Sequence, residues 1–166
     1  GFDERTPLEE TITAFAAAID TEQIRAWGCS TGSVREVEAW LLAADSAGLP
    51  RPAWVQSELS LVARSVERDL LPLLAEEGIG FVAYSPLAGG ILSGRYLTDD
   101  PEELPDPAAG SRLALAPAMY AAAFTLPNLA RVAALESLAR EREVGIAALA
   151  LAWLRRHPQV TAIIVS

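Results

Sequence analysis

The sequence predicts an α/β fold built from parallel strand–helix units, and two observations support this prediction. Short apolar segments recur along the chain, at 24–29, 53–57, 79–83 and 161–165. Longer segments with helical spacing of apolar residues separate them, as in right-handed βαβ units. Four such strands suit either a small doubly wound sheet or half of an eight-stranded barrel, which needs roughly 250 residues when complete. Periodicity alone leaves both open.

Capping residues predict two helices in the first third of the chain. Thr6 stands at an N-cap position, followed by Pro7 and by Glu9, which completes a capping box. The apolar pattern then continues the helix to about residue 20. A second capping box begins at Ser33 and predicts a helix that ends at Gly48.

The rest of the chain alternates in the same way, apart from one long segment. A helix over 65–77 should end at Gly78, and Pro72 predicts either a kink or a helix that begins near it. The segment 84–125 has little periodicity and many Gly and Pro residues. A connection of this length is usually functional or disordered. Two more helices are expected, over 126–142 and 146–156.

Composition excludes several classes of partner. The 166 residues carry a formal charge of −9, which disfavours nucleic acid and anionic membranes. Cys29 is the only cysteine, so no intrachain disulfide can form and a reducing, cytoplasmic location is expected. Neither a membrane-spanning run nor a signal peptide is recognisable. Because the sequence starts at Gly1 and its only methionine is Met119, we expect an excised or truncated piece.

The segment from Tyr84 to Tyr96, YSPLAGGILSGRY, has the residues that a ligand loop needs. An aromatic ring at the end of a strand can stack on a flat heterocycle. Glycines allow close approach of the backbone, and Arg95 supplies charge for a phosphate. From the residues alone this is either an anion or nucleotide loop or a tight turn that closes a barrel.

This segment resembles the loop after strand seven in the aldo-keto reductase superfamily. Other motifs resemble the same family in the same order along the chain: 3–11, 24–30, Gln56 with 57–59 and Arg64, and the helix segment 148–154. The resemblance implies a (β/α)8 barrel that binds NADPH across its C-terminal face. It also implies that 1–166 is the C-terminal half of a single barrel domain, strands five to eight, truncated at both ends.

The resemblance implies a set of cofactor-binding residues. Tyr84 corresponds to the ring that stacks on nicotinamide, and Gln56 to the residue that hydrogen-bonds the carboxamide, with Ser30 beside it. The pyrophosphate should lie along Ser85, Pro86, Leu87, Ala88 and Gly89, with Arg95 and Arg112 as its cationic contacts. Thr31 departs from the Asn or Arg that many members have there, which leaves one contact in doubt.

Three of these residues also have structural explanations. Gln56 could satisfy buried backbone groups. Tyr84 could pack at the rim of a barrel, and Arg112 could be a solvated loop charge.

The family's catalytic Asp, Tyr, Lys and His precede the matched segments, so no catalytic residue is assigned here. In this reading the His would immediately precede Gly1, and Asp3 is a helix-start carboxylate. In the family, a further cofactor-binding segment follows strand eight, and by this resemblance it would begin at about Ser166, the last residue of the sequence. The intact parent is then expected to reduce aldehydes or ketones by hydride transfer from NADPH, whereas this chain alone is inactive. Its partners would be the carbonyl substrate and the missing N-terminal half of the barrel, or another copy of itself.

Two other functions stay open. One is a non-catalytic, aldo-keto-reductase-like regulatory or interaction subunit, and the other is a self-associating half-barrel. The remaining polar candidates carry no chemistry in this reading. The pairs 76–77 and 102–103 are taken as solvated charges. His157, the only histidine, is expected at the surface end of a helix, so no metal site is predicted. Cys29 is expected to be a small buried residue.

Overall fold

A computed structural model describes residues 5–100 and 102–165 of the chain. The expectations about Gly1, Asp3 and Ser166 therefore lie outside the described residues. The chain divides into two compact units. The first comprises Gly1–Ser57, Ser65–Val82 and Gln159–Ala162, and the second comprises Glu58–Arg64, Ala83–Pro158 and Ile163–Ser166. Within the described part of the chain, no helix has the length and apolar character needed to cross a membrane.

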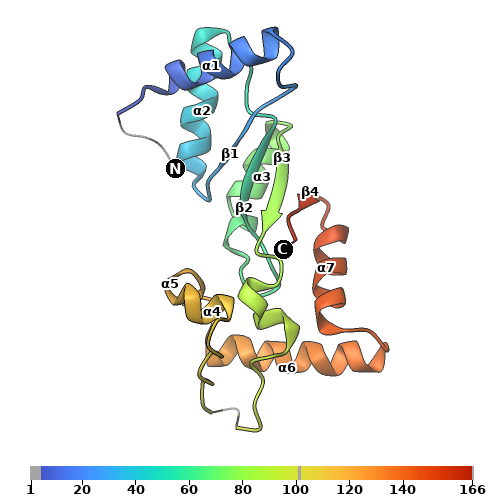
Figure 1. Cartoon of the computed structure of the whole chain (residues 1–166). Coiled ribbons are helices and arrows are strands. Elements are labelled where there is room, and N and C mark those ends of the chain that lie inside the picture. Colours follow the sequence, from blue (N-terminus) through green and yellow to red (C-terminus); the bar gives the residue numbers. More distant parts are fainter. Residues whose placement is uncertain (1–4, 101, 166) are drawn as a thin grey trace. The chain divides into compact units, whose positions relative to one another are not determined.

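Four strands of the described chain form one sheet, in the order in which they occur in the sequence (Figure 1). They are β1 (Gly28–Ser30), β2 (Trp54–Glu58), β3 (Gly80–Tyr84) and β4 (Val160–Ile163). β1 pairs with β2 in parallel, with Ser30 opposite Gln56. A doubly wound sheet would reverse its strand order, and this sheet does not. The parallel strand–helix prediction is confirmed, and of the two architectures the barrel type is the one supported.

The first strand is shorter than predicted, because it begins at Gly28 and the residues before it include Trp27, which packs in the core. Trp27 is buried, and its ring stacks on Phe15 at 5.2 Å and meets the edge of Trp40 at 5.3 Å. Its indole N–H donates to the carbonyl of Pro50 at 2.9 Å. The apolar residues that suggested a longer strand therefore include a core residue that packs against helices α1 (Leu8–Asp20) and α2 (Val34–Ala47).

The two predicted capping boxes fare differently. Helix α1 follows Pro7, and its N-cap makes no side-chain hydrogen bond, so the box at Thr6 is wrong. At α2, the Ser33 hydroxyl accepts from the N–H of Glu36 at 3.4 Å, as predicted. The N–H of Ser33, however, donates to the hydroxyl of Thr31 at 3.0 Å. Thr31 thus supplies the half of the motif that was expected from a Glu side chain.

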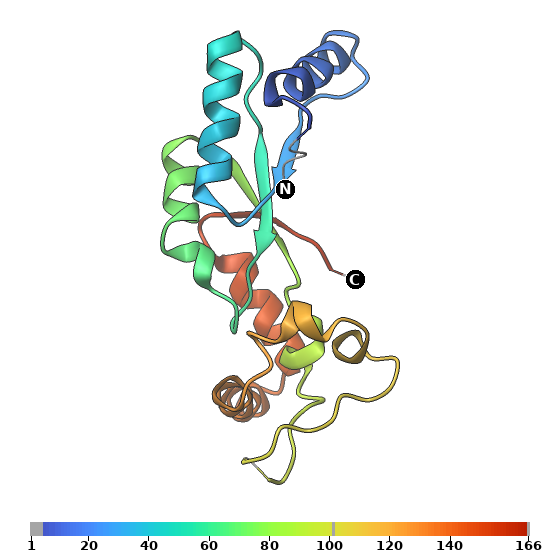
Figure 2. The ribbon, with the colours of Figure 1, turned by 90° about the vertical axis from the view of Figure 1, so that its left-hand side faces the viewer.

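The helices that follow β1 and β2 lie on one side of these strands (Figure 2). A 3-10 turn, η1 (Ser65–Glu67), precedes α3 (Leu70–Glu76), so the helix begins near Pro72, one of the two outcomes predicted. Gly78 takes a left-handed φ of 67°, as a residue after a helix often does. The strands and α3 supply residues that are almost fully buried: Val55 of β2, Leu70, Leu71 and Leu74 of α3, and Phe81 of β3.

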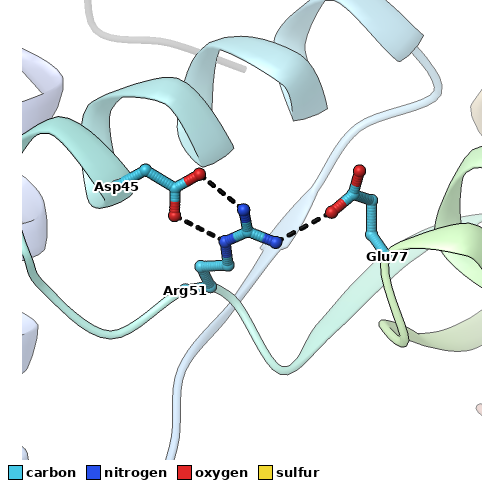
Figure 3. A network of polar contacts seen from close by, with 3 residues as sticks. All are labelled: Asp45, Arg51 and Glu77. Carbon is cyan, nitrogen blue, oxygen red and sulfur yellow. Dashed lines mark hydrogen bonds and ion pairs between the residues drawn. The ribbon is translucent and has the colours of Figure 1, made fainter.

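Arg51 links the ends of two helices in the first unit (Figure 3). Its Nε donates to Asp45 of α2 at 2.6 Å, and its Nη1 donates to Glu77 at 2.8 Å. Glu77, which follows α3, is therefore half of an ion pair at a helix end. Glu77 was expected to be a solvated charge, whereas the structure pairs it with Arg51 and leaves 33% of its side chain exposed.

In the second unit, the segment 84–125, which was expected to have little regular structure, contains three short helices among its described residues. It holds η2 (Ala88–Ser93), α4 (Arg112–Leu115) and α5 (Pro117–Tyr120) before the predicted helices α6 (Leu126–Glu141) and α7 (Ile146–Arg156). Two capping hydroxyls start these helices: Ser111 accepts from the N–H of Ala114, and Thr125 from that of Asn128. One buried cluster holds the unit together: Ala88, Ile91, Leu92, Tyr96, Leu113, Tyr120, Ala123, Leu129, Val132, Ala139, Ile146 and Ala150.

His157 lies directly after α7 and is half-buried. It meets the edge of Trp153 at 5.8 Å, and the guanidinium of Arg64 lies 5.2 Å from the Trp153 ring. The described residues hold no group of three or more His, Cys, Asp or Glu side chains that could bind a metal ion. His157 therefore packs against an aromatic ring at a helix end.

Candidate functional site: a hollow in the second unit

A hollow of about 410 Å³ lies in the second unit at the C-terminal end of β3. Its walls come from the segment after β3, from α4 and α5, from α7 and from the residues after β4. The lining residues are Tyr84, Ser85, Pro86, Leu87, Gly89, Gly90, Ser93, Arg95, Arg112, Tyr120, Leu151, Ile164 and Val165. Seven of the ten predicted cofactor residues are among them.

The backbone next to Tyr84 turns in a conformation that few residues adopt. Ser85 and Ala88 have φ of 50° and 48°, although neither is glycine, and Gly89 and Gly90 follow at 66° and 97°. At Ser85 and Ala88, which are not glycines, this conformation costs about 1–3 kcal/mol each, and such residues gather at ligand sites, where the surrounding structure enforces them. The turn is closed by hydrogen bonds from Ala88 N–H to Ser85 and from Gly90 N–H to Leu87, at 2.8 and 3.0 Å. Ala88 is fully buried and does not line the hollow.

Arg95 is fixed against this turn. Its Nε donates to the Ser93 hydroxyl at 3.2 Å, and that hydroxyl donates to the carbonyl of Gly90 at 2.7 Å. A Cβ built on Gly90 would lie 3.4 Å from the same Nε, an ordinary van der Waals distance, so the φ of 97°, and not a lack of space, favours glycine there. Arg112, the first residue of α4, faces the same hollow. Two arginines, Arg95 and Arg112, both exposed, therefore line the hollow, and no acidic residue is among its described lining.

Tyr84 presents a half-buried ring at the edge of the hollow. Burial, and then the nearby Glu58 and Tyr120, raise the pKa of the Tyr84 phenol above its ordinary value. Burial also raises the pKa of Glu58. The Tyr84 hydroxyl is therefore neutral at physiological pH, and its ring can serve as an uncharged stacking surface.

Ser30 and Gln56 lie in the first unit, opposite each other on β1 and β2. Ser30 is exposed and Gln56 is half-buried. The Gln56 carbonyl accepts from the N–H of Thr31 at 3.0 Å, but its side-chain amide makes no hydrogen bond to any described residue. Satisfaction of buried backbone groups therefore does not explain this glutamine. Its role, like that of Ser30, stays a prediction.

Sequence reasoning missed six of the described residues that line the hollow: Gly90, Ser93, Tyr120, Leu151, Ile164 and Val165. Tyr120 of α5 lies in the segment that was expected to have little structure, and no local pattern marks it. Gly90 and Ser93 belong to the motif from Tyr84 to Tyr96 but were given no role, and both line the hollow.

Cys29 is half-buried on β1, where burial and the charge of Glu36 raise its pKa to about 11. Its thiol is therefore protonated at neutral pH and is no nucleophile there.

Comparison with known proteins identifies the family. The family model for aldo/keto reductases matches residues 2–166. The chain belongs to the aldo/keto reductase family. It is 37% identical over 166 residues to a probable voltage-gated potassium channel β subunit of Arabidopsis thaliana, covering 98% of this chain and 48% of that protein. It is 30% identical over 165 residues to an L-glyceraldehyde 3-phosphate reductase of Escherichia coli K12, covering 98% and 46%.

Solved structures of the family share this fold. A glycerol dehydrogenase of Gluconobacter oxydans matches with a TM-score of 0.73 and 25% identity, over 98% of this chain and 46% of that one. An aldo/keto reductase of Klebsiella pneumoniae in complex with NADP and acetate matches with a TM-score of 0.68 and 28% identity, over 99% and 45%. The chain therefore has the parallel strand–helix units of a TIM-type barrel and spans about half the length of the relatives it matches.

Proposed function

We propose that this chain is part of an NADPH-dependent oxidoreductase that reduces aldehydes or ketones to alcohols. In this proposal the chain supplies much of the cofactor-binding site of that enzyme. The observation that carries the proposal is the hollow after β3, where Arg95, Arg112, a left-handed glycine turn and the ring of Tyr84 come together. Family membership and the NADP-bound relative support the same cofactor class.

The residues of the hollow fit such a cofactor chemically. A pyrophosphate is anionic, and two guanidinium groups can contact it through charge-assisted hydrogen bonds. The hollow, at about 410 Å³, falls within the range of small-molecule sites, roughly 300–1,000 Å³. The turn at Gly89 and Gly90 lets backbone approach a ligand closely.

When bound, the nicotinamide supplies a hydride for the carbonyl carbon of the substrate. In this proposal Tyr84 covers one face of the nicotinamide ring and limits the positions it can take. Ser85, Pro86, Leu87, Gly89 and the two arginines, which line the hollow, would hold the phosphates, and the buried Ala88 would support the turn from behind. By the family resemblance, Gln56 and Ser30 would orient the carboxamide. The proton donor and its partners would come from the Asp, Tyr, Lys and His of the family, so we expect these 166 residues alone to catalyse no carbonyl reduction.

A second candidate is a regulatory subunit, because one similar protein is described as a probable voltage-gated potassium channel β subunit. Both candidates can bind NADPH, so binding does not distinguish them. Turnover of a panel of aldehydes by the whole protein does. A third candidate, the self-associating half-barrel, predicts a mass in solution that is a multiple of that of one chain.

The cofactor assignment is tested by titrating NADPH against variants of the whole protein. Arg95→Ala and Arg112→Ala should each weaken binding by about 1–3 kcal/mol and reduce its dependence on salt, because each removes charge aimed at a phosphate. Tyr84→Ala should slow hydride transfer at saturating NADPH, because the nicotinamide is less well placed. Arg140→Ala is the matched control, since Arg140 lies on α6 and pairs with Glu136 outside the hollow.

Each result bears on a separate part of the proposal. If both arginine variants bind NADPH with unchanged affinity, the assignment of the cofactor to this hollow is wrong. If Tyr84→Ala lowers only the melting temperature of the apo protein, the ring is a packing residue.

A further inference from the structure

We propose that Tyr120 is a positioning residue for the cofactor, holding the left-handed turn at Gly89 in the shape that receives the phosphates. This inference rests on the cofactor role proposed for the hollow. Tyr120 would act through the turn, by fixing the course of the backbone between Tyr84 and Arg95.

The contact between Tyr120 and the turn is close. A Cβ built on Gly89 would lie 2.9–3.0 Å from three atoms of the Tyr120 ring, Cζ, Cε1 and Cε2. Real side chains do not approach so closely, so the ring lies directly over the glycine and excludes any larger residue. Two features therefore favour glycine at position 89: its φ of 66°, and the Tyr120 ring, which leaves no space for a Cβ.

Tyr120 is itself held firmly. Only 3% of its surface is exposed, although it lines the hollow, and it belongs to the buried cluster of the second unit with Leu113. Its carbonyl accepts from the N–H groups of Ala123 and Phe124, at 2.9 and 2.8 Å. Packing has fixed this ring in the chain, so the ring can in turn fix the residue beneath it.

The same piece of chain also carries Arg112. Helix α4 begins with Arg112 after the Ser111 cap, and α5 ends with Tyr120. The ring of Tyr120 and the guanidinium of Arg112 thus reach the hollow from one short helical segment. Tyr120 is also close enough to Tyr84 to affect its pKa. It therefore lies beside two of the elements assigned to the cofactor, the stacking ring and the turn, and it lines the same hollow as Arg112.

The physical role follows from the strain in the turn. Ser85 and Ala88, which are not glycines, take left-handed conformations that isolated residues avoid. A turn of this kind would relax if nothing held it, and a ligand would then have to reorder it on binding. Pre-organisation by the Tyr120 ring removes that cost and raises affinity without a contact to the ligand.

The first test compares variants of Tyr120 in the whole protein. Tyr120→Ala should weaken NADPH binding roughly tenfold per folded molecule, while kcat at saturating NADPH changes by less than about twofold. Tyr120→Phe keeps the ring and should rescue the affinity. Met119→Ala is the matched control, because Met119 is its neighbour on α5 and is 61% exposed. A melting curve of each apo variant gives the folded fraction.

A second test changes Gly89, the residue under the Tyr120 ring, alone and together with Tyr120. Gly89→Ala and Gly110→Ala impose a similar backbone strain, at φ of 66° and 79°, but a Cβ on Gly110 would meet no atom within 4 Å. Gly89→Ala should therefore weaken NADPH binding several times more than Gly110→Ala. In the double variant Gly89→Ala/Tyr120→Ala, the ring that opposes the new methyl is gone. The combined loss should then be smaller than the product of the two single losses.

The outcomes separate this inference from the function it rests on. If Tyr120→Ala lowers the apo melting temperature but leaves NADPH affinity and the KM for NADPH unchanged, Tyr120 only packs and the inference is wrong. Multiplicative losses in the double variant would contradict it as well. If Arg95→Ala and Arg112→Ala weaken binding in the same assay while Tyr120→Ala does not, the cofactor site stands and only the role of Tyr120 fails. If none of them weakens binding, the cofactor site itself is wrong.

Discussion

Cys29 should react with disulfide reagents more slowly than an ordinary cysteine, because its environment suppresses the thiolate. Burial on β1, and next the negative charge of Glu36, raise its pKa to about 11. The thiolate is the species that attacks a disulfide, so the reaction rate reports this shift directly.

The size of the effect follows from two opposing terms. At pH 8 a thiol of ordinary pKa, roughly 8.5, is about 24% ionised, whereas one with a pKa of about 11 is about 0.1% ionised, a difference of about 240-fold. A more basic thiolate is also a better nucleophile, with a Brønsted slope of roughly 0.4–0.5, which returns about 10- to 18-fold over this shift. The smaller thiolate fraction outweighs the higher nucleophilicity. Cys29 is therefore expected to react about 13- to 24-fold more slowly than an ordinary thiol, before any steric shielding by burial.

The assay is modification by an aromatic disulfide, followed at the peptide that contains Cys29 by mass spectrometry. The rate should rise about tenfold per pH unit up to about pH 10, where an ordinary thiol has already levelled off. Glu36→Gln removes one cause of the shift and should move the profile to lower pH. Glu38→Gln, an exposed glutamate on the same helix that is not among the causes, is the matched control.

A profile that levels off below pH 9 would refute the reasoning about burial. A shift of equal size in Glu36→Gln and Glu38→Gln would refute the role given to Glu36. In the unfolded chain Cys29 should react at the rate of a model thiol, which the same assay checks in urea.

Two further predictions concern stability. Phe81 is fully buried on β3, so Phe81→Ala should lower the free energy of unfolding by about 3–5 kcal/mol in a urea titration. A loss below about 1 kcal/mol would mean that this core is not as packed as described. The hydrogen bond from Arg51 lowers the pKa of Asp45, so its contribution to stability is present above the unfolded pKa, near 4, and is lost as pH falls through the folded value. The difference in urea midpoint between wild type and Arg51→Ala should thus shrink between pH 7 and pH 3; an equal difference at both would contradict the pairing.

Some features of the fold could be predicted because they are decided locally. The hydroxyl of Ser33 caps α2, and Gly48 and Gly78 take left-handed conformations after helices, as the sequence indicated. The segments that became β2 and β3 were also correctly placed. The run 79–83 is continuously apolar, which is typical of a strand in a parallel sheet, whereas 53–57 also contains Gln56 and Ser57.

Errors arose where another contact, distant in one case and local in the other, outweighed the expected pattern. The apolar run at 24–27 was read as strand, but Trp27 is instead used as a core residue between helices. The Glu expected to complete the capping box at Ser33 was displaced by Thr31. The same Thr31 was noted as a departure from the family pattern, and its hydrogen bond to Ser33 is a local structural use for it.

The candidate site divides in the same way. The motif from Tyr84 to Tyr96 could be identified from sequence because its residues are contiguous and their types match a phosphate loop. Tyr120 could not, because helices of four residues such as α4 and α5 have no stability of their own. They form only when Leu113 and Tyr120 enter the buried cluster, which is a tertiary event.

The sequence by itself therefore determined the alternation of strands and helices, several helix ends and the chemistry of the loop after β3. The order of the strands in the sheet followed from the family resemblance and not from periodicity. The tertiary structure alone decided the course of the segment between Arg95 and Thr125 and the placing of Tyr120 over Gly89. The physical reason is the range of the interactions. A cap, a glycine φ or an apolar run acts over a few neighbouring residues. Strand order and the contact of a ring with a turn 31 positions earlier in the chain depend on which surfaces pack together once the chain has folded.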